Sequence, residues 1–345
     1  MNVVIDRYKK IRKKGLLLKK YKGKYAFVGI GNHSINNLYP VLNYLNVDIK
    51  YIVVRSEDTL SLIKENFPHV IATTNLEDVL SDNDIKGVFV SASPSSHFEI
   101  SKQVLNSGKN LFIEKPPCSS LIELDELQAL DSASKGQVLA GLQRRYSPVY
   151  NMLLNKVKKA SYYTLKYKTG GYPEGDELLD LFIHPLDAMF FLFGTGKIQN
   201  VKVIQGNGTI IYLAQIQHLN GTIGSLELST DYSWTGAQDV LIVNTPKGEY
   251  VTENTSSLSF QTKPKVIMNV PLEKVNGFIP QITILYQQNN FLPVKEHNQL
   301  YSSGYYTELE SFLNVCEKGS SENKSTLSSL SSTFEAIEIL RLAKG

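Results

Sequence analysis

The chain of 345 residues is 42% hydrophobic and 20% charged, which is typical of a globular protein with a sizeable core, and its length favours two domains. It has no apolar run of about 18 residues and no apolar region of a signal peptide behind its basic start, so we expect neither a transmembrane helix nor a secretory leader. Two cysteines are too few for a disulfide framework or a metal cluster, so we expect a reduced, cytoplasmic protein.

The positive charge is concentrated at the start of the chain. Residues 1–24 carry ten Lys or Arg and one acid, so 26 of the 36 basic and 32 of the 33 acidic residues lie beyond them. Such a basic segment could touch nucleic acid or anionic lipid, but a solvated extension or an oligomer arm is favoured. We therefore expect an extension over residues 1–24, with no nucleic-acid partner and no membrane contact.

From Tyr25 to about residue 143, buried strand patterns alternate with helical ones, which predicts a Rossmann domain with a doubly wound parallel sheet. Pro40 predicts a kink or restart in the first helix. The expected strands are 25–30, 49–54, 70–73, 87–92, 111–115 and 138–142, and the expected helices are 35–45, 60–67, 76–80, 97–107 and 121–133.

From residue 144 onward the pattern changes to that of an α+β domain with an open, mostly antiparallel sheet. We expect helices at 149–157 and 178–193, and strands at 162–169, 201–206, 209–218, 224–230 and 240–244. Two closing helices, 305–316 and 327–342, are expected to pack back on the first domain. The serine-rich segment 320–332 is predicted to be a loop.

The first strand ends in a glycine turn, Gly29-Ile30-Gly31-Asn32-His33-Ser34. Glycines here permit a tight turn and let backbone N–H groups approach a pyrophosphate at a helix N-terminus. Ser34 stands at the third glycine position and is small enough for helix–strand packing. Gly29, Gly31, Asn32 and His33 are therefore candidate cofactor-binding residues.

The second strand ends in Arg55 and Ser56 rather than in an acid. Arginine suits the 2′-phosphate of NADP(H), because its guanidinium can bind phosphate in a bidentate manner. We therefore favour NADP(H) over NAD(H), with both residues as cofactor contacts. In the alternative, Arg55 is a surface charge and Glu57 or Asp58 binds the ribose.

The fourth long strand runs into Ser93-Pro94-x-x-His97, where loops line a dinucleotide crevice. Ser93 and Pro94 are expected to pack along the ribose and the nicotinamide. His97 begins the next helix; we count it among the cofactor contacts, although a structural histidine is favoured over a catalytic one.

The fifth strand ends in Glu114-Lys115-Pro116, about eighty residues after the glycine turn. A lysine at the carboxyl end of a parallel strand, downstream of a dinucleotide turn, lies where a nicotinamide ring would bind. This position indicates hydride transfer rather than nucleotide storage. Glu114 and Lys115 are expected to contact the cofactor.

An apolar helix contains Asp180, His184 and Asp187, spaced by four and three residues so that they share one face. Burying these groups without partners would be costly, so a pocket explains them best. A histidine there can accept a hydroxyl proton while hydride leaves for the nicotinamide. Lys115, Asp180 and His184 are the candidate catalytic residues.

Over residues 25–345 the sequence resembles the glucose–fructose oxidoreductase / inositol dehydrogenase / MocA (Gfo/Idh/MocA) family of NAD(P)-dependent oxidoreductases. The matching segments are 28–32, 93–97, 107–117, 141–148, 178–187 and 308–312, of which Glu114-Lys115-Pro116 is the most specific. Ser34, Arg55, the Leu181-Phe182-Ile183 stretch and the basic extension depart from the family pattern.

The resemblance implies a role for each matched residue. Lys115 would bond the reacting hydroxyl or carbonyl, His184 would be the general acid/base, and Asp180 would hold the substrate hydroxyl or orient the histidine. Gln143 and Arg144 would lie at the nicotinamide end. The C-terminal sheet would pack face to face in a homodimer or homotetramer.

Three classes of function remain open. The first is a dehydrogenase of a sugar, polyol or nucleotide-sugar, for which Tyr172, Tyr232 and Trp234 are candidate stacking residues. The second is a reductase of another C=O or C=N bond in biosynthesis. The third is a non-catalytic NAD(P)-binding sensor, against which the presence of Lys115 together with Asp180 and His184 argues.

Overall fold

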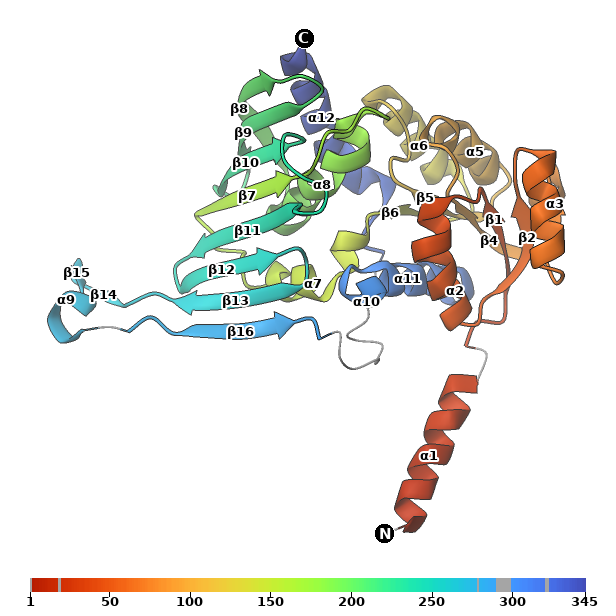
Figure 1. Ribbon diagram of the computed structural model, residues 1–345, viewed down its shortest axis with the longest axis horizontal. Helices are drawn as coiled ribbons and strands as arrows, with labels where there is room; N and C mark the ends of the chain where they lie inside the picture. Colours follow the sequence, from red (N-terminus) through yellow and green to blue (C-terminus); the bar gives the residue numbers. More distant parts are fainter. Residues whose placement is uncertain (1, 18–19, 278, 290–298, 320–322) are drawn as a thin grey trace.

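Two β-sheets lie side by side, each with helices packed against it, and an N-terminal helix projects away from both (Figure 1). The computed structural model describes residues 2–17, 20–277, 279–289, 299–319 and 323–345. Parts of two expectations, the basic extension (residues 1, 18 and 19) and the serine-rich loop (residues 320–322), lie outside the described residues. The projecting helix, α1 (Asn2–Leu17), occupies most of the basic extension.

The first sheet is fully parallel, in the spatial order β3-β2-β1-β4-β5-β6. Its strands are β1 (Lys24–Val28), β2 (Asp48–Val53), β3 (Ile71–Thr73), β4 (Ile85–Val90), β5 (Asn110–Glu114) and β6 (Val138–Gly141). The connections contain η1 (Ser34–Leu38), α2 (Tyr39–Tyr44), α3 (Glu57–Asn66), α4 (Glu77–Leu80), α5 (Pro94–Asn106) and α6 (Leu121–Ala133). The strand order reverses at β1, which creates the crevice where such sheets bind dinucleotides.

Helix α11 (Tyr305–Lys318), from near the end of the chain, completes the cover of this sheet. Phe312 on α11 lies edge-on to Phe89 on β4, with ring centroids 4.9 Å apart, and also contacts Phe112 on β5. All three rings are fully buried. The first domain therefore has a core to which the last part of the sequence contributes.

The second sheet is mixed and mostly antiparallel, in the order β16-β13-β12-β11-β7-β10-β9-β8, and among its described strands β7 and β10 pair in parallel. Its strands are β7 (Tyr162–Lys168), β8 (Gly196–Gln205), β9 (Ile210–His218), β10 (Ile223–Ser229), β11 (Gln238–Thr245), β12 (Gly248–Glu253), β13 (Ser257–Thr262) and β16 (Ile282–Gln287). Strands β7 and β9 to β12 alternate between buried and more accessible residues, because only one face is covered.

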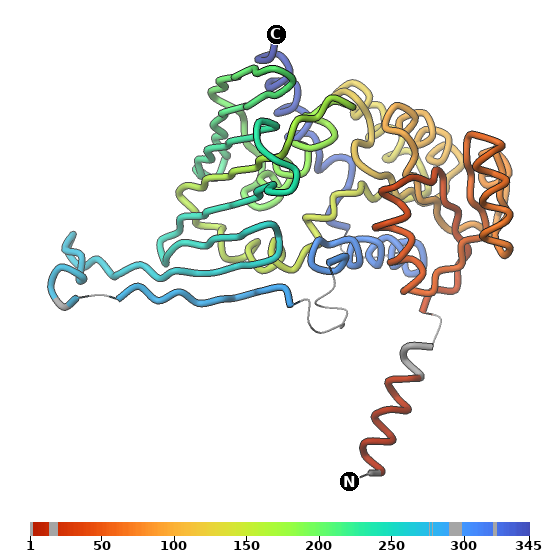
Figure 2. The backbone as a smooth tube through the Cα atoms, in the orientation of Figure 1, coloured from red at the N-terminus to blue at the C-terminus, as the bar shows by residue number. Residues whose placement is uncertain are grey.

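Helices α8 (Ile183–Phe193) and α12 (Ser331–Lys344) cover one face of this sheet (Figure 1). Tyr163 on β7 stacks on Phe193 of α8 at 4.3 Å, and both side chains are buried. The short helices around them are η2 (Gln143–Tyr146), α7 (Pro148–Leu154), η3 (Leu178–Phe182), α10 (Gln299–Ser302) and η5 (Leu327–Leu330). Beyond β13 and before β16, the chain forms an arm that protrudes from the sheet edge and carries β14 (Val266–Ile267), β15 (Val270–Pro271) and α9 (Glu273–Asn276) (Figure 2).

The fold class predicted from the sequence is confirmed, a parallel Rossmann sheet followed by an α+β region with a mostly antiparallel sheet. The prediction of a serine-rich loop over residues 320–332 is wrong in part, because η5 and the first two residues of α12 lie within it and Leu327 and Leu330 are buried. The predicted helix 178–193 is a π-helical turn, η3, that continues into α8. No helix of the described chain is long and apolar enough to cross a lipid bilayer. No group of three or more His, Cys, Asp and Glu residues within the described ranges could hold a metal ion.

Candidate functional site

The glycine turn after β1 leaves room for a close approach to the backbone. Gly29 adopts φ +90° and donates its N–H to Val53 O at 2.8 Å, and a Cβ atom there would lie 2.5 Å from Ser91 O. A side chain at Gly31 would meet nothing within 4 Å. Ser34 is buried and closes the turn, because its hydroxyl accepts from Gly31 N and donates to Gly31 O. The turn can therefore approach a phosphate, as dinucleotide binding requires.

Asn32 and His33 begin the helix that follows this turn. Asn32 is exposed and accepts a hydrogen bond from Asn36. The His33 ring lies edge-on to Tyr305 of α11 at 5.7 Å, and its Nε2 lies 3.4 Å from Glu114 Oε1. His33 thus brings together three of the segments that border the crevice.

Arg55 and Ser56 follow β2 at the same edge of the sheet. The side chain of Arg55 is exposed, and no ion pair of it occurs among the described residues. The Ser56 hydroxyl accepts from Thr59 N at 3.2 Å and caps α3. Arg55 is thereby placed at the start of a helix with its charge free for a ligand, and Glu57 and Asp58 lie in the first turn of that helix.

Ser93 and Pro94 follow β4, where Ser93 precedes α5 and its Oγ lies 2.9 Å from Ser96 Oγ. His97 is fully buried, with Nδ1 2.8 Å from Pro116 O and Nε2 3.0 Å from Ala92 O. Burial lowers the pKa of His97 against the effect of these carbonyls. In this structure His97 braces one crevice loop against another and presents no ring surface to a ligand.

Lys115 follows β5 and joins the two halves of the molecule. Its ammonium donates to the backbone oxygen of Asp180 at 2.6 Å. Burial lowers the pKa of Lys115, while the charges of Glu114 and Asp180 oppose that shift. Glu114 is buried and accepts from Lys115 N at 3.1 Å through Oε2. The Lys115–Pro116 peptide bond is cis.

Asp180 lies in η3, and its Oδ2 accepts a hydrogen bond from the Tyr172 hydroxyl at 3.2 Å. Gly175 permits this arrangement, since a Cβ there would lie 2.3 Å from the same oxygen. Tyr172 in turn lies edge-on to Trp234, whose Nε1–H donates to Gly171 O at 3.0 Å. One of the three aromatic candidates, Tyr172, therefore bonds the carboxylate of Asp180, and a second, Trp234, packs against Tyr172. The third, Tyr232, lies under the ammonium of Lys168 at 4.3 Å.

His184 lies one turn beyond Asp180, at the start of α8. Its Nδ1 is buried and has no hydrogen-bond partner among the described residues. Burial lowers the pKa of His184 well below its usual value, and the charges of Lys115, Arg144 and His33 lower it further. The ring is therefore neutral at pH 7 and can accept a proton.

Asp187 shares the polar face of this helix but belongs to a different group. Its carboxylate accepts two hydrogen bonds from the Arg145 guanidinium, at 2.8 and 2.5 Å, and a third from Thr333 at 3.2 Å. Asp187, Arg145 and Thr333 are all fully buried. This ion pair fastens η2 and α12 to α8.

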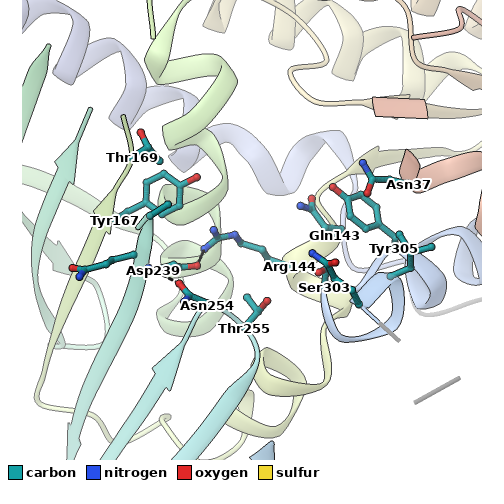
Figure 3. A pocket seen from close by; sticks show the side chains of 14 residues that line it. Asn37, Gln143, Arg144, Tyr167, Thr169, Asp239, Asn254, Thr255, Ser303 and Tyr305 are labelled. Atoms are coloured by element: carbon teal, nitrogen blue, oxygen red, sulfur yellow. Dashed lines mark hydrogen bonds and ion pairs between the residues drawn. The ribbon is translucent and has the colours of Figure 1, made fainter. Parts of the chain in front are cut away.

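Arg144 faces a cleft between the two sheets, while Gln143 lines the wall of that cleft (Figure 3). The Arg144 guanidinium pairs with Asp239 at 2.6 Å and lies over the Tyr167 ring at 5.3 Å. The cleft has a volume of about 330 Å³. Its wall consists of Asn37, Gln143, Arg144, Tyr167, Thr169, Ala237, Gln238, Asp239, Asn254, Thr255, Gln299, Leu300, Ser303 and Tyr305.

The candidate catalytic residues lie beside this cleft rather than in its wall. Two residues of the wall connect the cleft to its surroundings. The charge of Arg144 lowers the pKa of His184, and the Tyr305 ring contacts His33. No motif in the sequence indicated that Asp239 or Tyr305 would lie at the site. Asp239 occupies an inward position of a strand, and Tyr305 begins a helix about 160 residues beyond Arg144, so only the folded chain brings them together.

The described residues can accommodate a dinucleotide. The glycine turn would exclude a Cβ at Gly29, and Arg55 at the end of β2 forms no ion pair with the described residues. Within the described part of the chain, the buried atoms His184 Nδ1 and Glu114 Oε1 have no hydrogen-bond partner, although Glu114 Oε1 lies 3.4 Å from His33 Nε2. Buried polar atoms normally have partners, so these positions suit a bound molecule. A nicotinamide held beside Lys115 would supply the hydride-transfer chemistry.

Comparison with known proteins supports this interpretation of the first domain. Residues 23–142 match the model of an oxidoreductase family with an NAD-binding Rossmann fold. The uncharacterized oxidoreductase YhhX of Escherichia coli K12 is 31% identical over 49% of this chain, and the match spans only 53% of YhhX. An inositol 2-dehydrogenase of Salmonella paratyphi B is 26% identical over 36% of this chain and 40% of its own length. A dehydrogenase structure from Chromobacterium violaceum shares the fold, with a TM-score of 0.78 at 19% identity over 93% of this chain and 94% of its own.

Proposed function

We propose that this chain, a member of the Gfo/Idh/MocA oxidoreductase family, transfers hydride between NAD(P) and a hydroxyl or carbonyl carbon of a sugar, polyol or nucleotide-sugar. The observation that carries the proposal is the hydrogen bond from Lys115 Nζ to Asp180 O. It joins the nicotinamide edge of the Rossmann sheet to the helix that carries His184. Hydride transfer needs such a junction, because donor and acceptor carbons must be held in contact.

In the direction of oxidation, neutral His184 accepts the hydroxyl proton as hydride leaves the same carbon. Lys115 hydrogen-bonds the reacting oxygen and stabilises the negative charge that develops on it. Asp180, held by Tyr172, orients the substrate hydroxyl or the His184 ring. In reduction, the protonated histidine returns its proton to the alkoxide.

The proposal includes the assembly and the cofactor. Within the described residues, one face of the second sheet is more exposed than the other. This supports a homodimer or homotetramer that packs through that sheet, in a cytoplasmic protein. The free guanidinium of Arg55 at the end of β2 supports NADP(H) over NAD(H). Analytical ultracentrifugation would show a monomer at micromolar concentration if the assembly is wrong.

The direct test is reduction of NADP⁺ and NAD⁺ against a panel of sugars, polyols and nucleotide-sugars, followed at 340 nm. We expect turnover with at least one member, and a loss of about 10²–10⁴-fold in kcat for His184→Ala, the range that general acid–base catalysis contributes. His69→Ala, at a surface position outside the site, is the matched control. Wild-type turnover by His184→Ala would reject the acid/base role, and Arg55→Ala with an unchanged cofactor preference would reject the role of Arg55.

A further inference from the structure

Asp239 and Arg144 form an ion pair at the centre of the cleft, and one oxygen of the carboxylate is left over. Arg144 Nη1 bonds Asp239 Oδ2 at 2.6 Å. Asp239 Oδ1 is buried and has no hydrogen-bond partner among the described residues. An unpaired carboxylate oxygen in a buried site is costly unless a ligand supplies a donor.

The pair is held rigidly by its surroundings. Asp239 N donates to Asn254 Oδ1 at 2.9 Å, and Asn254 N donates to Asp239 O at 2.8 Å, which fixes the start of β11. The Arg144 guanidinium lies on the Tyr167 ring and also donates to the Tyr150 hydroxyl at 3.4 Å. Neither charge is free to move to another partner without breaking these contacts.

The cleft therefore carries no net charge. Asp239 and Arg144 are the two residues of the described wall that are ionised at neutral pH, and they neutralise each other. The rest of the wall offers hydroxyl and amide groups, from Thr169, Asn254 and Thr255 among others. An anionic ligand would have to displace the carboxylate from Arg144 or lie against it, and like charges at close range are unfavourable.

We propose that this cleft selects an uncharged polyol ring and discriminates against rings that carry a carboxylate. In the bound state a ring hydroxyl donates to Asp239 Oδ1, and the neighbouring hydroxyl accepts an N–H of the Arg144 guanidinium. The inference rests on the proposed function, because it assigns the class of substrate that the cleft beside the candidate catalytic residues would hold. Asp239 is the specificity-determining residue for two reasons. Its carboxylate binds the ring hydroxyl, and it pairs with the Arg144 guanidinium, so that this cation cannot bind an anionic ligand.

The test measures binding by isothermal titration calorimetry, which does not depend on turnover. The probes are three matched pairs, D-glucose and D-glucuronate, D-galactose and D-galacturonate, and D-mannose and D-mannuronate. We expect the wild-type protein to bind at least one neutral sugar about tenfold or more tightly than its uronate. Asp239→Asn should reduce that ratio by about tenfold or reverse it, because the guanidinium becomes available to the carboxylate.

Glu253→Gln is the control, since it removes an exposed acid of the same sheet outside the cleft wall, and its ratios should stay within about twofold of wild type. If Asp239→Asn does not fold, Arg144→Gln provides a second test. The unpaired Asp239 carboxylate should then bind the cationic sugar D-glucosamine about fivefold more tightly than D-glucose. A wild-type preference for uronates, unchanged ratios in both folded variants, or no binding of any neutral sugar would overturn the proposal. Binding with the expected ratios but without NAD(P) reduction would instead reject the proposed hydride transfer.

Discussion

The three candidate catalytic residues come from two segments that meet only in the folded chain. Lys115 follows β5, whereas Asp180 and His184 lie at the junction of η3 and α8, and the 2.6 Å bond from Lys115 to the Asp180 carbonyl joins them. The sequence suggests these three residues as candidates because each lies in a short local motif. Arg144 was predicted to lie at the nicotinamide end. Its partner Asp239 could not be predicted, because the two residues lie about 95 positions apart in the sequence, in η2 and in β11.

Activity should depend on pH through His184 and Lys115. His184 must be neutral to accept a proton, and burial and the charges of Lys115, Arg144 and His33 lower its pKa well below 6.5. For oxidation, the acid limb of the kcat/KM profile should therefore lie below pH 6.5. Burial also lowers the pKa of Lys115, so the alkaline limb should lie below pH 10.5. An acid limb at or above pH 6.5, or one that persists in His184→Asn, would contradict this assignment.

At the level of elements, the polar face of α8 divides into two functions. Its first turn carries His184 toward the site, and its next turn carries Asp187 into the buried pair with Arg145. The spacing of the three polar residues predicted one shared face, but it could not distinguish a site residue from a structural one. That distinction depends on Arg145 and Thr333, which reach Asp187 from other elements. Strands β12, β13 and β16 were not predicted, although Ser257–Thr262 alternates polar and apolar residues at its start.

Removing the carboxylate of this buried pair should destabilise the protein strongly. Asp187→Ala leaves the Arg145 guanidinium buried without its partner, and breaking a buried pair in this way costs about 3–5 kcal/mol. The free energy of unfolding, measured in urea, should fall by that amount. Glu338→Ala, which breaks a surface pair with Arg341, should cost less than about 1 kcal/mol. Equal losses for the two variants would show that the Asp187–Arg145 pair is not a structural fastening.

At the level of the whole molecule, the basic segment and the folded body meet at Tyr21. Its side chain is buried with α11, and its hydroxyl lies 3.5 Å from Asn314 Oδ1. Just beyond it, the backbone N–H groups of Lys22 and Gly23 donate to Glu317. The charge asymmetry predicted an extension over residues 1–24, but charge alone could not locate the residue at which burial begins.

Truncations on either side of Tyr21 should differ in their effect on stability. A chain that starts at Lys20 should keep its kcat/KM and its unfolding midpoint, because α1 projects away from both sheets (Figure 1). A chain that starts at Lys24 loses a buried tyrosine and should be less stable by about 3–5 kcal/mol, the cost of large deletions in a core. Urea unfolding of both proteins measures the difference. Two truncations of equal stability would place Tyr21 outside the core.

The central claim is that hydride passes directly between a substrate carbon and a nicotinamide held beside Lys115. The most direct measurement is mass spectrometry of the cofactor after turnover of the best panel substrate, deuterated at its reacting carbon. We predict one deuterium in the reduced nicotinamide with the wild-type protein. With Lys115→Met, we predict a drop of several orders of magnitude in the rate of labelling, although the cofactor should still bind. Reduced cofactor without deuterium, or labelling by Lys115→Met at the wild-type rate, would contradict the account.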